Sequence, residues 1–313
     1  MYTSFYGLKD EPFRLTPDPR YLHLSAPYQH ALTAVLEGII YRKGLVMITG
    51  PIGTGKTTLV NAVLQLLWDQ KMPIKSALLF NPTLTREEFL EMLLEEFEVT
   101  CTATSKPKRL AALHHMLLDT QRQGGTSVLF IDEAHLLSSE LLEEIRLLSN
   151  SDTHQEKTLQ IVLSGQPELV PIMKRPELSA LQQRIAIRAQ LQPLSRTETS
   201  AYIAERLHSA GLRESSPFPA STVEAIYGFT QGVPRLLNLL CDGCLTLGFR
   251  AQRKTILSDI VEEVAVSLSL ALPAPVNERK YDPIPELAAV GMQRTAVDIL
   301  IDALKRNRSE VRE

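Results

Sequence analysis

The chain has 313 residues, of which 44% are hydrophobic and 22% charged, a composition typical of a soluble globular protein with a sizeable core. Lys and Arg number 33 against 36 Asp and Glu, and the net charge of −3 argues against a surface that coats nucleic acid or an acidic membrane. Three cysteines are too few for a disulfide framework, and the sequence shows neither a secretory signal nor an apolar run of about 20 residues. We therefore expect a cytoplasmic protein.

Residues 1–43 begin with prolines and aromatic residues and continue into a helical pattern from Tyr28 to Tyr41. From residue 44 to 194, short β-like runs alternate with longer amphipathic stretches, as in a parallel sheet with helices on both faces. The expected strands are 45–49, 76–80, 128–131, 159–163 and 185–191. We predict an α/β domain over residues 44–194, on which the N-terminal segment 1–43 packs.

Helical periodicity replaces the strand pattern after Ser195 and predicts a separate, small all-helical domain over residues 195–272. A polar, proline-bearing stretch over 273–285 is typical of a linker, and a last amphipathic helix is expected within 286–313. Three expected helices begin with a capping box, in which Glu follows a Ser or Thr by three positions. The pairs are Thr85 with Glu88, Ser195 with Glu198 and Ser221 with Glu224.

A glycine-rich run directly follows the first expected strand and leads into a helical pattern from Leu59 to Trp68. It fits G-x-x-x-x-G-K-[ST], the phosphate-binding loop or P-loop, and the strand and helix supply the context that this motif requires. The run consists of Gly50, Pro51, Ile52, Gly53, Thr54, Gly55, Lys56, Thr57 and Thr58. In such loops successive backbone N–H groups converge on phosphate oxygens at a helix N-terminus. We expect ATP as the ligand, with Lys56 on the β and γ phosphates and Thr57 on Mg²⁺.

The apolar strand 128–131 is followed by two acidic residues, Asp132 and Glu133. A buried strand delivers its first acid to the carboxyl edge of the sheet, beside the P-loop, where a carboxylate can hold Mg²⁺. Glu133 is then placed to orient or deprotonate the water that attacks the γ-phosphate. The string Asp-Glu-Ala-His, which His135 completes, also occurs in helicases. No second helicase-type core follows, so we treat His135 as incidental.

Further polar residues are candidates for contact with the γ-phosphate. Gln166 or Ser164, at the end of the expected strand 159–163, could sense it by a hydrogen bond, and we favour Gln166. Arg184 precedes the last expected strand, and Arg235 opens a helix of the helical domain. Arginines in such places can reach a phosphate from a lid or from a neighbouring subunit. Their positions alone do not distinguish this role from ordinary surface ion pairs.

Cys241 and Cys244 spell C-x-x-C, which can indicate redox chemistry or zinc. Zinc would need another pair of ligands, and only Cys101 remains among the cysteines. Because the pair falls within an expected helix, we predict two buried side chains that act as small hydrophobic residues.

These motifs resemble the AAA+ branch of the P-loop ATPases and, more narrowly, the general secretion pathway protein A (ExeA-like) family. The resemblance covers most of residues 1–270, in order. It rests on the P-loop and on FYGLKDEPF at 5–13, TPDP at 16–19, YLHLS at 21–25, FIDEAH at 130–135, SGQPEL at 164–169, QR at 183–184 and GVPRL at 232–236.

The resemblance implies an AAA+ α/β domain, a helical lid, and a nucleotide held between the subunits of a ring-shaped or helical homo-oligomer. It implies Gln166 at the first sensor position, Arg184 as an arginine finger supplied in trans, and Arg235 as the sensor of the lid. Secretion-type members are expected to continue through a membrane span into a periplasmic peptidoglycan-binding part, and we find neither in these 313 residues.

We expect an ATP hydrolase that drives or regulates assembly of an envelope machine for secretion, pilus formation or export. Its partners would be envelope assembly proteins, met in the cytoplasm or peripherally at the inner membrane, without membrane insertion. The alternative is a DNA-associated regulator like the transposition ATPases of the TniB or TnsC type, with duplex DNA as partner. A third reading is a nucleotide-dependent scaffold without turnover. The mildly acidic composition favours the first over the second.

Overall fold

The structure is a computed structural model, and it describes residues 2–16, 21, 23–69, 73–80, 82–150 and 157–270. The predicted linker 273–285 and the C-terminal helix within 286–313 lie outside the described residues. Contacts divide the chain into two compact units. The α/β unit is Ala26–Gln192, and the helical unit comprises the described residues of Met1–Ser25 and Pro193–Glu313.

The α/β unit is built on five parallel strands in the order β2-β3-β4-β1-β5. They are β1 (Leu45–Thr49), β2 (Ile74–Leu79), β3 (Thr126–Ile131), β4 (Leu159–Gly165) and β5 (Ile185–Gln190). The predicted parallel sheet is thereby confirmed. Every residue of β4 and all but the first of β3 are buried, as expected for central strands covered on both faces.

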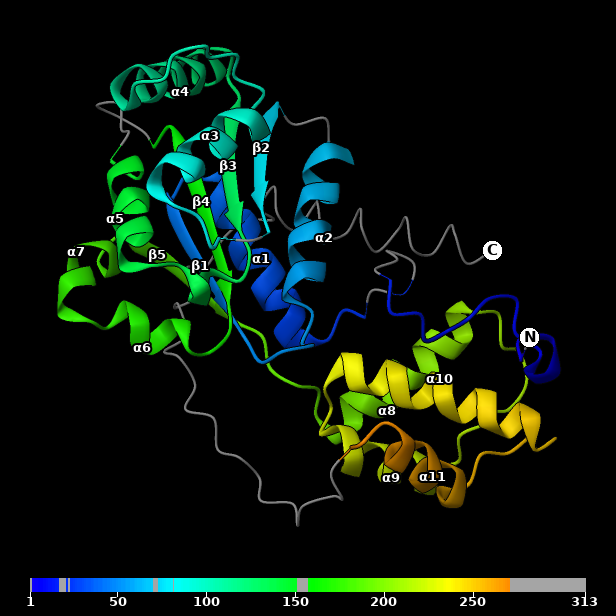
Figure 1. Ribbon diagram of the computed structural model, residues 1–313. Helices are drawn as coiled ribbons and strands as arrows, with labels where there is room; N and C mark the ends of the chain where they lie inside the picture. Colours follow the sequence, from blue (N-terminus) through cyan, green and yellow to red (C-terminus); the bar gives the residue numbers. More distant parts are fainter. Residues whose placement is uncertain are drawn as a thin grey trace, which may run out of the picture. The chain divides into compact units, whose positions relative to one another are not determined.

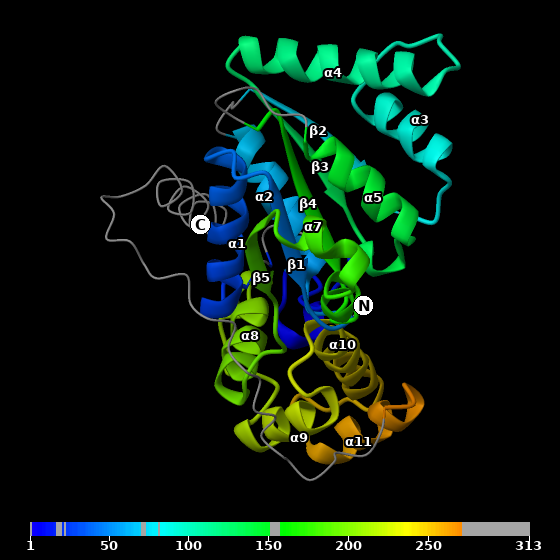
Figure 2. The ribbon, with the colours of Figure 1, turned by 90° about the vertical axis from the view of Figure 1, so that its left-hand side faces the viewer.

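Helices cover both faces of the sheet (Figures 1 and 2). Figure 2 shows α1 and α2 on one side of the strands, with α3, α5 and α7 on the other. The α-helices of this unit are α1 (Ala26–Ile40), α2 (Lys56–Asp69), α3 (Arg86–Glu96), α4 (Lys106–Arg122), α5 (Ser139–Leu148), α6 (Leu169–Met173) and α7 (Ser179–Gln182). Two single 3-10 turns, η3 (Ala134–Leu136) and η4 (Pro176–Leu178), complete the connections among its described residues. Alternate strand residues such as Met47, Leu129 and Ile161 form one core with the apolar faces of α3 and α5.

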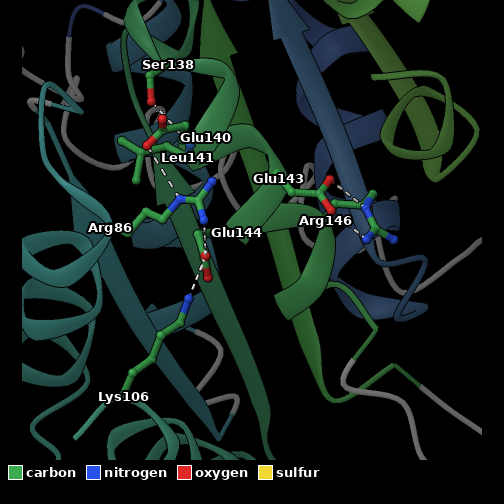
Figure 3. A network of polar contacts seen from close by, with 8 residues as sticks. All are labelled: Arg86, Lys106, Ser138, Glu140, Leu141, Glu143, Glu144 and Arg146. Carbon is green, nitrogen blue, oxygen red and sulfur yellow. Dashed lines mark hydrogen bonds and ion pairs between the residues drawn. The ribbon is translucent and has the colours of Figure 1, made fainter. Parts of the chain in front are cut away.

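One carboxylate of α5 links the beginnings of α3 and α4 (Figure 3). Glu144 is buried, and its Oε1 lies 2.6 Å from Nζ of Lys106 and 3.7 Å from Nη1 of Arg86. Lys106 and Arg86 are the first residues of their helices, where the helix dipole also favours a negative charge. Ser138 caps α5 by accepting a hydrogen bond from the amide of Leu141 at 3.2 Å. Helix α5 is thus fixed directly downstream of β3.

The helical unit contains α8 (Arg196–Ser209), α9 (Ala220–Thr230), α10 (Pro234–Arg250) and α11 (Ser258–Ser267), together with the short turn η1 (Ser4–Tyr6). Its core joins apolar residues of all four helices to aromatic residues from the beginning of the chain. Cys241 and Cys244 are both free and buried in this core, as predicted, and burial raises the pKa of the Cys244 thiol to about 12. None of the helices in the described part of the chain combines the length and hydropathy of a membrane-spanning segment.

The beginning of the chain differs from the expectation for segment 1–43. Helix α1 packs on the sheet, whereas the described residues before it belong to the helical unit and contact its helices. Arg206 of α8 is buried there, and its Nε donates to the carbonyl oxygen of Pro12 at 2.6 Å. Its guanidinium carbon lies 5.0 Å from the ring centre of Tyr21 and 5.3 Å from that of Tyr202. Large aromatic side chains near the beginning of the chain therefore pack against residues about 200 positions later in the sequence.

Two of the three predicted capping boxes are confirmed, those of Thr85 with Glu88 and Ser195 with Glu198. The third, at Ser221, is wrong, because α9 already begins at Ala220 and has Pro219 at its N-cap. The carboxylate of Glu224 is bound by Arg196 instead of turning back to the helix start.

We predict that Glu144→Gln lowers the free energy of unfolding by about 1–2 kcal/mol, because two cations lose the charge they share at a buried site while remaining partly exposed to water. Glu143→Gln is the matched control on the same helix, since Glu143 is 41% exposed and forms its ion pair with Arg146 of α5 itself. Urea unfolding followed by circular dichroism measures both variants. Equal stability of the two would show that the link to α3 and α4 contributes no more than an ion pair within one helix.

Candidate functional site

The predicted P-loop joins the carboxyl end of β1 to the first turn of α2. Gly53 and Gly55 have φ angles of +80° and +97°, a left-handed conformation that favours glycine. Among the described residues no backbone carbonyl accepts from the amides of Gly53, Gly55, Lys56 or Thr57. Four amides thus remain available at the N-terminus of a 14-residue helix, an arrangement suited to an anion.

Lys56 is buried and lies over this loop. Its Nζ donates to the carbonyl oxygens of Gly50 at 2.9 Å and Pro51 at 3.2 Å. Burial lowers the pKa of Lys56, an effect opposed by the carboxylates of Glu133 and Asp132. The sheet edge therefore holds one cation facing two acids, with the free amides of the loop beside it.

Asp132 is the residue at which the elements of the site meet. Its Oδ2 accepts a hydrogen bond from Oγ1 of Thr57 at 2.7 Å, and its Oδ1 accepts one from Oγ of Ser164 at 2.8 Å. Strand β4 lies between β1 and β3, so Ser164 stands between the P-loop strand and the strand that carries the acid. The structure therefore brings the predicted Thr57 and Asp132 together and adds Ser164 to them.

Hydroxyl and carboxylate oxygens are the ligands that Mg²⁺ prefers, and the adjoining Thr57 and Asp132 provide one of each. In the described part of the chain no group of three or more His, Cys, Asp or Glu residues could hold a metal by itself. The pair fits the usual Mg²⁺ arrangement, in which one or two protein ligands act together with phosphate oxygens and water.

Glu133 follows Asp132 in a left-handed conformation, with φ of +50°, and its amide donates to Oδ1 of Asp132 at 3.0 Å. Such a φ is uncommon outside glycine and turns the Glu133 side chain away from the direction that the strand would give it. Its Oε2 lies 3.4 Å from Nδ1 of His135, and the same nitrogen accepts from the amide of Gln166 at 3.4 Å. His135, treated as incidental in the sequence, thus lies between the two predicted catalytic residues.

The candidates for the first sensor occupy different places. Ser164 is buried and bound to Asp132, whereas Gln166 is half-buried and contacts His135 through its backbone amide. Proximity to Asp132 alone would have favoured Ser164, but the register of β4 against β3 that creates it cannot be deduced from one strand's sequence.

Arg184 lies at the edge of the sheet opposite the P-loop. It directly precedes β5, whose first residue, Ile185, pairs with Leu45 at the beginning of β1. Because both strands run in the same direction, the P-loop follows at the far end of β1, about 17 Å away along a five-residue strand. The half-buried Arg184 is therefore poorly placed for the P-loop of its own chain.

Arg235 belongs to the helical unit, where it is exposed in the first turn of α10. The turn before it contains Gly232, with φ of +71°, whose carbonyl oxygen accepts from the amide of Leu194 at 2.9 Å. A Cβ at Gly232 would lie 1.8 Å from the carbonyl oxygen of Leu194, so only glycine fits. The entry of the chain into the helical unit is thereby tied to the turn that presents Arg235.

Comparisons with known proteins show the family and the fold. The model of the AAA domain family AAA_22 matches residues 39–173. General secretion pathway protein A of Aeromonas hydrophila is 37% identical over 264 residues, which are 83% of this chain and 47% of that protein. The chain thus spans about half the length of this curated relative.

Solved structures with the same fold include Cdc6p and ORC. Cdc6p from Pyrobaculum aerophilum has a TM-score of 0.65 at 17% identity, and the match covers 83% of this chain and 71% of the Cdc6p chain. A structure of Drosophila ORC bound to DNA has a TM-score of 0.66 at 18% identity, covering 87% of this chain and 67% of the matched chain. At these identities the likeness shows the fold alone. The chain is an AAA+ P-loop protein of the general secretion pathway protein A (ExeA-like) type.

Proposed function

We propose that the protein hydrolyses ATP and that its hydrolysis cycle drives or regulates assembly of an envelope machine. The observation that carries hydrolysis is the grouping at the carboxyl edge of the sheet, where Thr57 and Ser164 both bind Asp132 while Glu133 follows at once. A nucleotide-binding scaffold without turnover would have no use for a second acid in a strained backbone conformation beside the first.

In this proposal the free amides of the P-loop and the ammonium group of Lys56 bind the β and γ phosphates. Thr57 and Asp132 hold Mg²⁺, which when bound supplies positive charge against the phosphate oxygens. Glu133 orients the attacking water and accepts its proton, and Gln166, with Ser164 as the alternative, senses the γ-phosphate. Arg184 from a neighbouring subunit stabilises the charge that develops during transfer, and Arg235 couples loss of the γ-phosphate to movement of the lid.

The proposed setting follows from the relative, whose name places it in a general secretion pathway. We propose envelope assembly proteins as partners and a homo-oligomer as the active form, because Arg184 is remote from the P-loop along the sheet. The transposition-type alternative gains no support from the comparisons, since the DNA-bound structure of the same fold is only 18% identical. Duplex DNA remains an outcome that the experiment below can detect.

The pathway is tested with Glu133→Gln protein held in ATP and used as bait in lysates of the source cells. Recovery of envelope assembly proteins with ATP but not with ADP supports the proposal. Recovery of DNA-bound proteins, together with an ATPase rate of the unchanged protein that rises with duplex DNA at low salt, would replace it by the DNA-associated alternative.

Glu133→Gln should bind ATP with nearly unchanged affinity and lower kcat by about 100-fold or more, because the amide cannot accept the proton of the attacking water. Calorimetry measures binding, and release of phosphate measures turnover. Glu140→Gln, at a carboxylate 72% exposed on α5, is the control and should keep both properties. Normal turnover by Glu133→Gln would assign the water-activating role to another residue.

Lys56→Ala and Arg184→Ala should each be nearly inactive alone, yet regain activity when mixed. Lys56→Ala weakens ATP binding by about 10–100-fold, because a charge-assisted contact with the phosphates is lost. Arg184→Ala binds ATP, but each of its sites lacks the arginine that the neighbouring subunit would supply. A mixed oligomer contains sites with lysine from one subunit and arginine from the next. Activity of the mixture equal to the mean of the separate proteins would contradict the role in trans.

A further inference from the structure

His135 is the first residue of interest here, since neither the P-loop motif nor the proposed mechanism uses it. It belongs to η3, directly downstream of β3, and its side chain is only 11% exposed. Its Nδ1 lies 3.4 Å from Oε2 of Glu133 and 3.4 Å from the amide nitrogen of Gln166. One ring nitrogen therefore stands between the proposed water-activating carboxylate and the proposed sensor turn.

The carboxylate of Glu133 needs such a partner. Although the Glu133 side chain is 42% exposed, its Oε2 is shielded from water and forms no hydrogen bond with any described residue. A shielded carboxylate oxygen without a donor is destabilising. His135 is within ion-pair distance of this oxygen, so its Nδ1 can complete the bond when that nitrogen carries a proton.

A single nitrogen can serve only one of these two neighbours at a time. Without a proton, Nδ1 is an acceptor and binds the amide of Gln166; with a proton, it is a donor and binds Glu133. The structure shows the first arrangement, in which Gln166 donates and Oε2 of Glu133 is left without a partner. The positions of Glu133 and Gln166 are thus linked through the His135 ring.

The backbone around the ring makes this link short. Gly165 ends β4 and directly precedes Gln166. A Cβ at Gly165 would lie 3.2 Å from the backbone nitrogen of His135, so the two turns are in direct contact. Movement of the turn at Gln166 would therefore displace His135 directly, without any intervening side chain.

We infer that His135 is a positioning residue for ATP hydrolysis, which shares its Nδ1 between the amide of Gln166 and the carboxylate of Glu133. A shift of the turn when Gln166 contacts the γ-phosphate releases Nδ1. Exchange with water then moves the ring proton from Nε2 to Nδ1, and the Nδ1–H group donates to Oε2 of Glu133 and holds this carboxylate toward the attacking water. The inference rests on the proposed hydrolytic function, and it assigns to His135 no contact with the nucleotide.

Steady-state kinetics test the inference with His135→Phe, which keeps a ring but no nitrogen, and His135→Asn, whose amide lies near the place of Nδ1. We expect His135→Phe to lower kcat about 10-fold, as for misplacement of a catalytic group, with KM for ATP changed less than about twofold. His135→Asn should have a kcat close to that of the unchanged protein. The same exchange at an exposed position of α4, His115→Phe, is the control and should leave kcat unchanged. A kcat of His135→Phe within twofold of the unchanged protein, or no rescue by Asn, would overturn the inference.

A second measurement needs no turnover and so separates this inference from the hydrolytic proposal. In protein labelled with ¹⁵N, Glu133→Gln should shift the Nδ1 resonance of His135 and the amide resonance of Gln166 in the absence of nucleotide. Glu140→Gln should shift neither. Unchanged resonances in Glu133→Gln would refute the shared contact even if ATP is hydrolysed, whereas shifted resonances in a protein that hydrolyses no ATP would refute only the proposed function.

Discussion

The carboxylate of Asp132 holds the candidate site together, and the neighbouring elements are arranged around its hydrogen bonds. It receives the hydroxyl of Thr57 from the first turn of α2 and that of Ser164 from β4. The amide of Glu133 adds a third donor. Charge-assisted bonds of this kind are roughly twice as strong as neutral ones, and here they connect the P-loop helix with two strands of the sheet. Strand order makes this geometry available, because β4 separates β1 from β3.

The same edge of the sheet carries groups of both charges, which suit an anion together with its cation. Four backbone amides and a buried lysine gather positive potential, while Asp132 and Glu133 bring negative charge within reach. Lys56 meanwhile contacts loop carbonyls, and Oε2 of Glu133 has no donor among the described residues. A site prepared in this manner gains its stabilising contacts upon binding, as preorganised electrostatic sites do.

Local signals in the sequence were enough to predict the sheet, the P-loop and the place of Asp132, because alternation of strands and helices and a motif of fixed spacing depend on neighbours in the chain. Properties that depend on distant partners could not be predicted in this way. The hydroxyl of Ser164 reaches Asp132 through strand register, and His135 follows the left-handed conformation of Glu133 and lies 3.4 Å from its carboxylate. Likewise, the capping box at Ser221 is wrong because α9 begins one residue earlier, at Ala220, with Pro219 at its N-cap.

The attachment of the first residues to the helical unit has a consequence for the order of folding. The hydroxyl of Tyr6 donates to the carbonyl oxygen of Arg253, 247 positions later, whereas Ala26–Gln192 form a compact unit without a break. During synthesis, which proceeds from the N-terminus, the α/β unit can therefore close first, while the initial aromatic residues wait for α8 to α11. Loop closure over so long a separation is slow. Until then Tyr2, Tyr6 and Phe13, all buried in the finished protein, have no core to enter. Apolar surface exposed in this way promotes aggregation of a nascent chain.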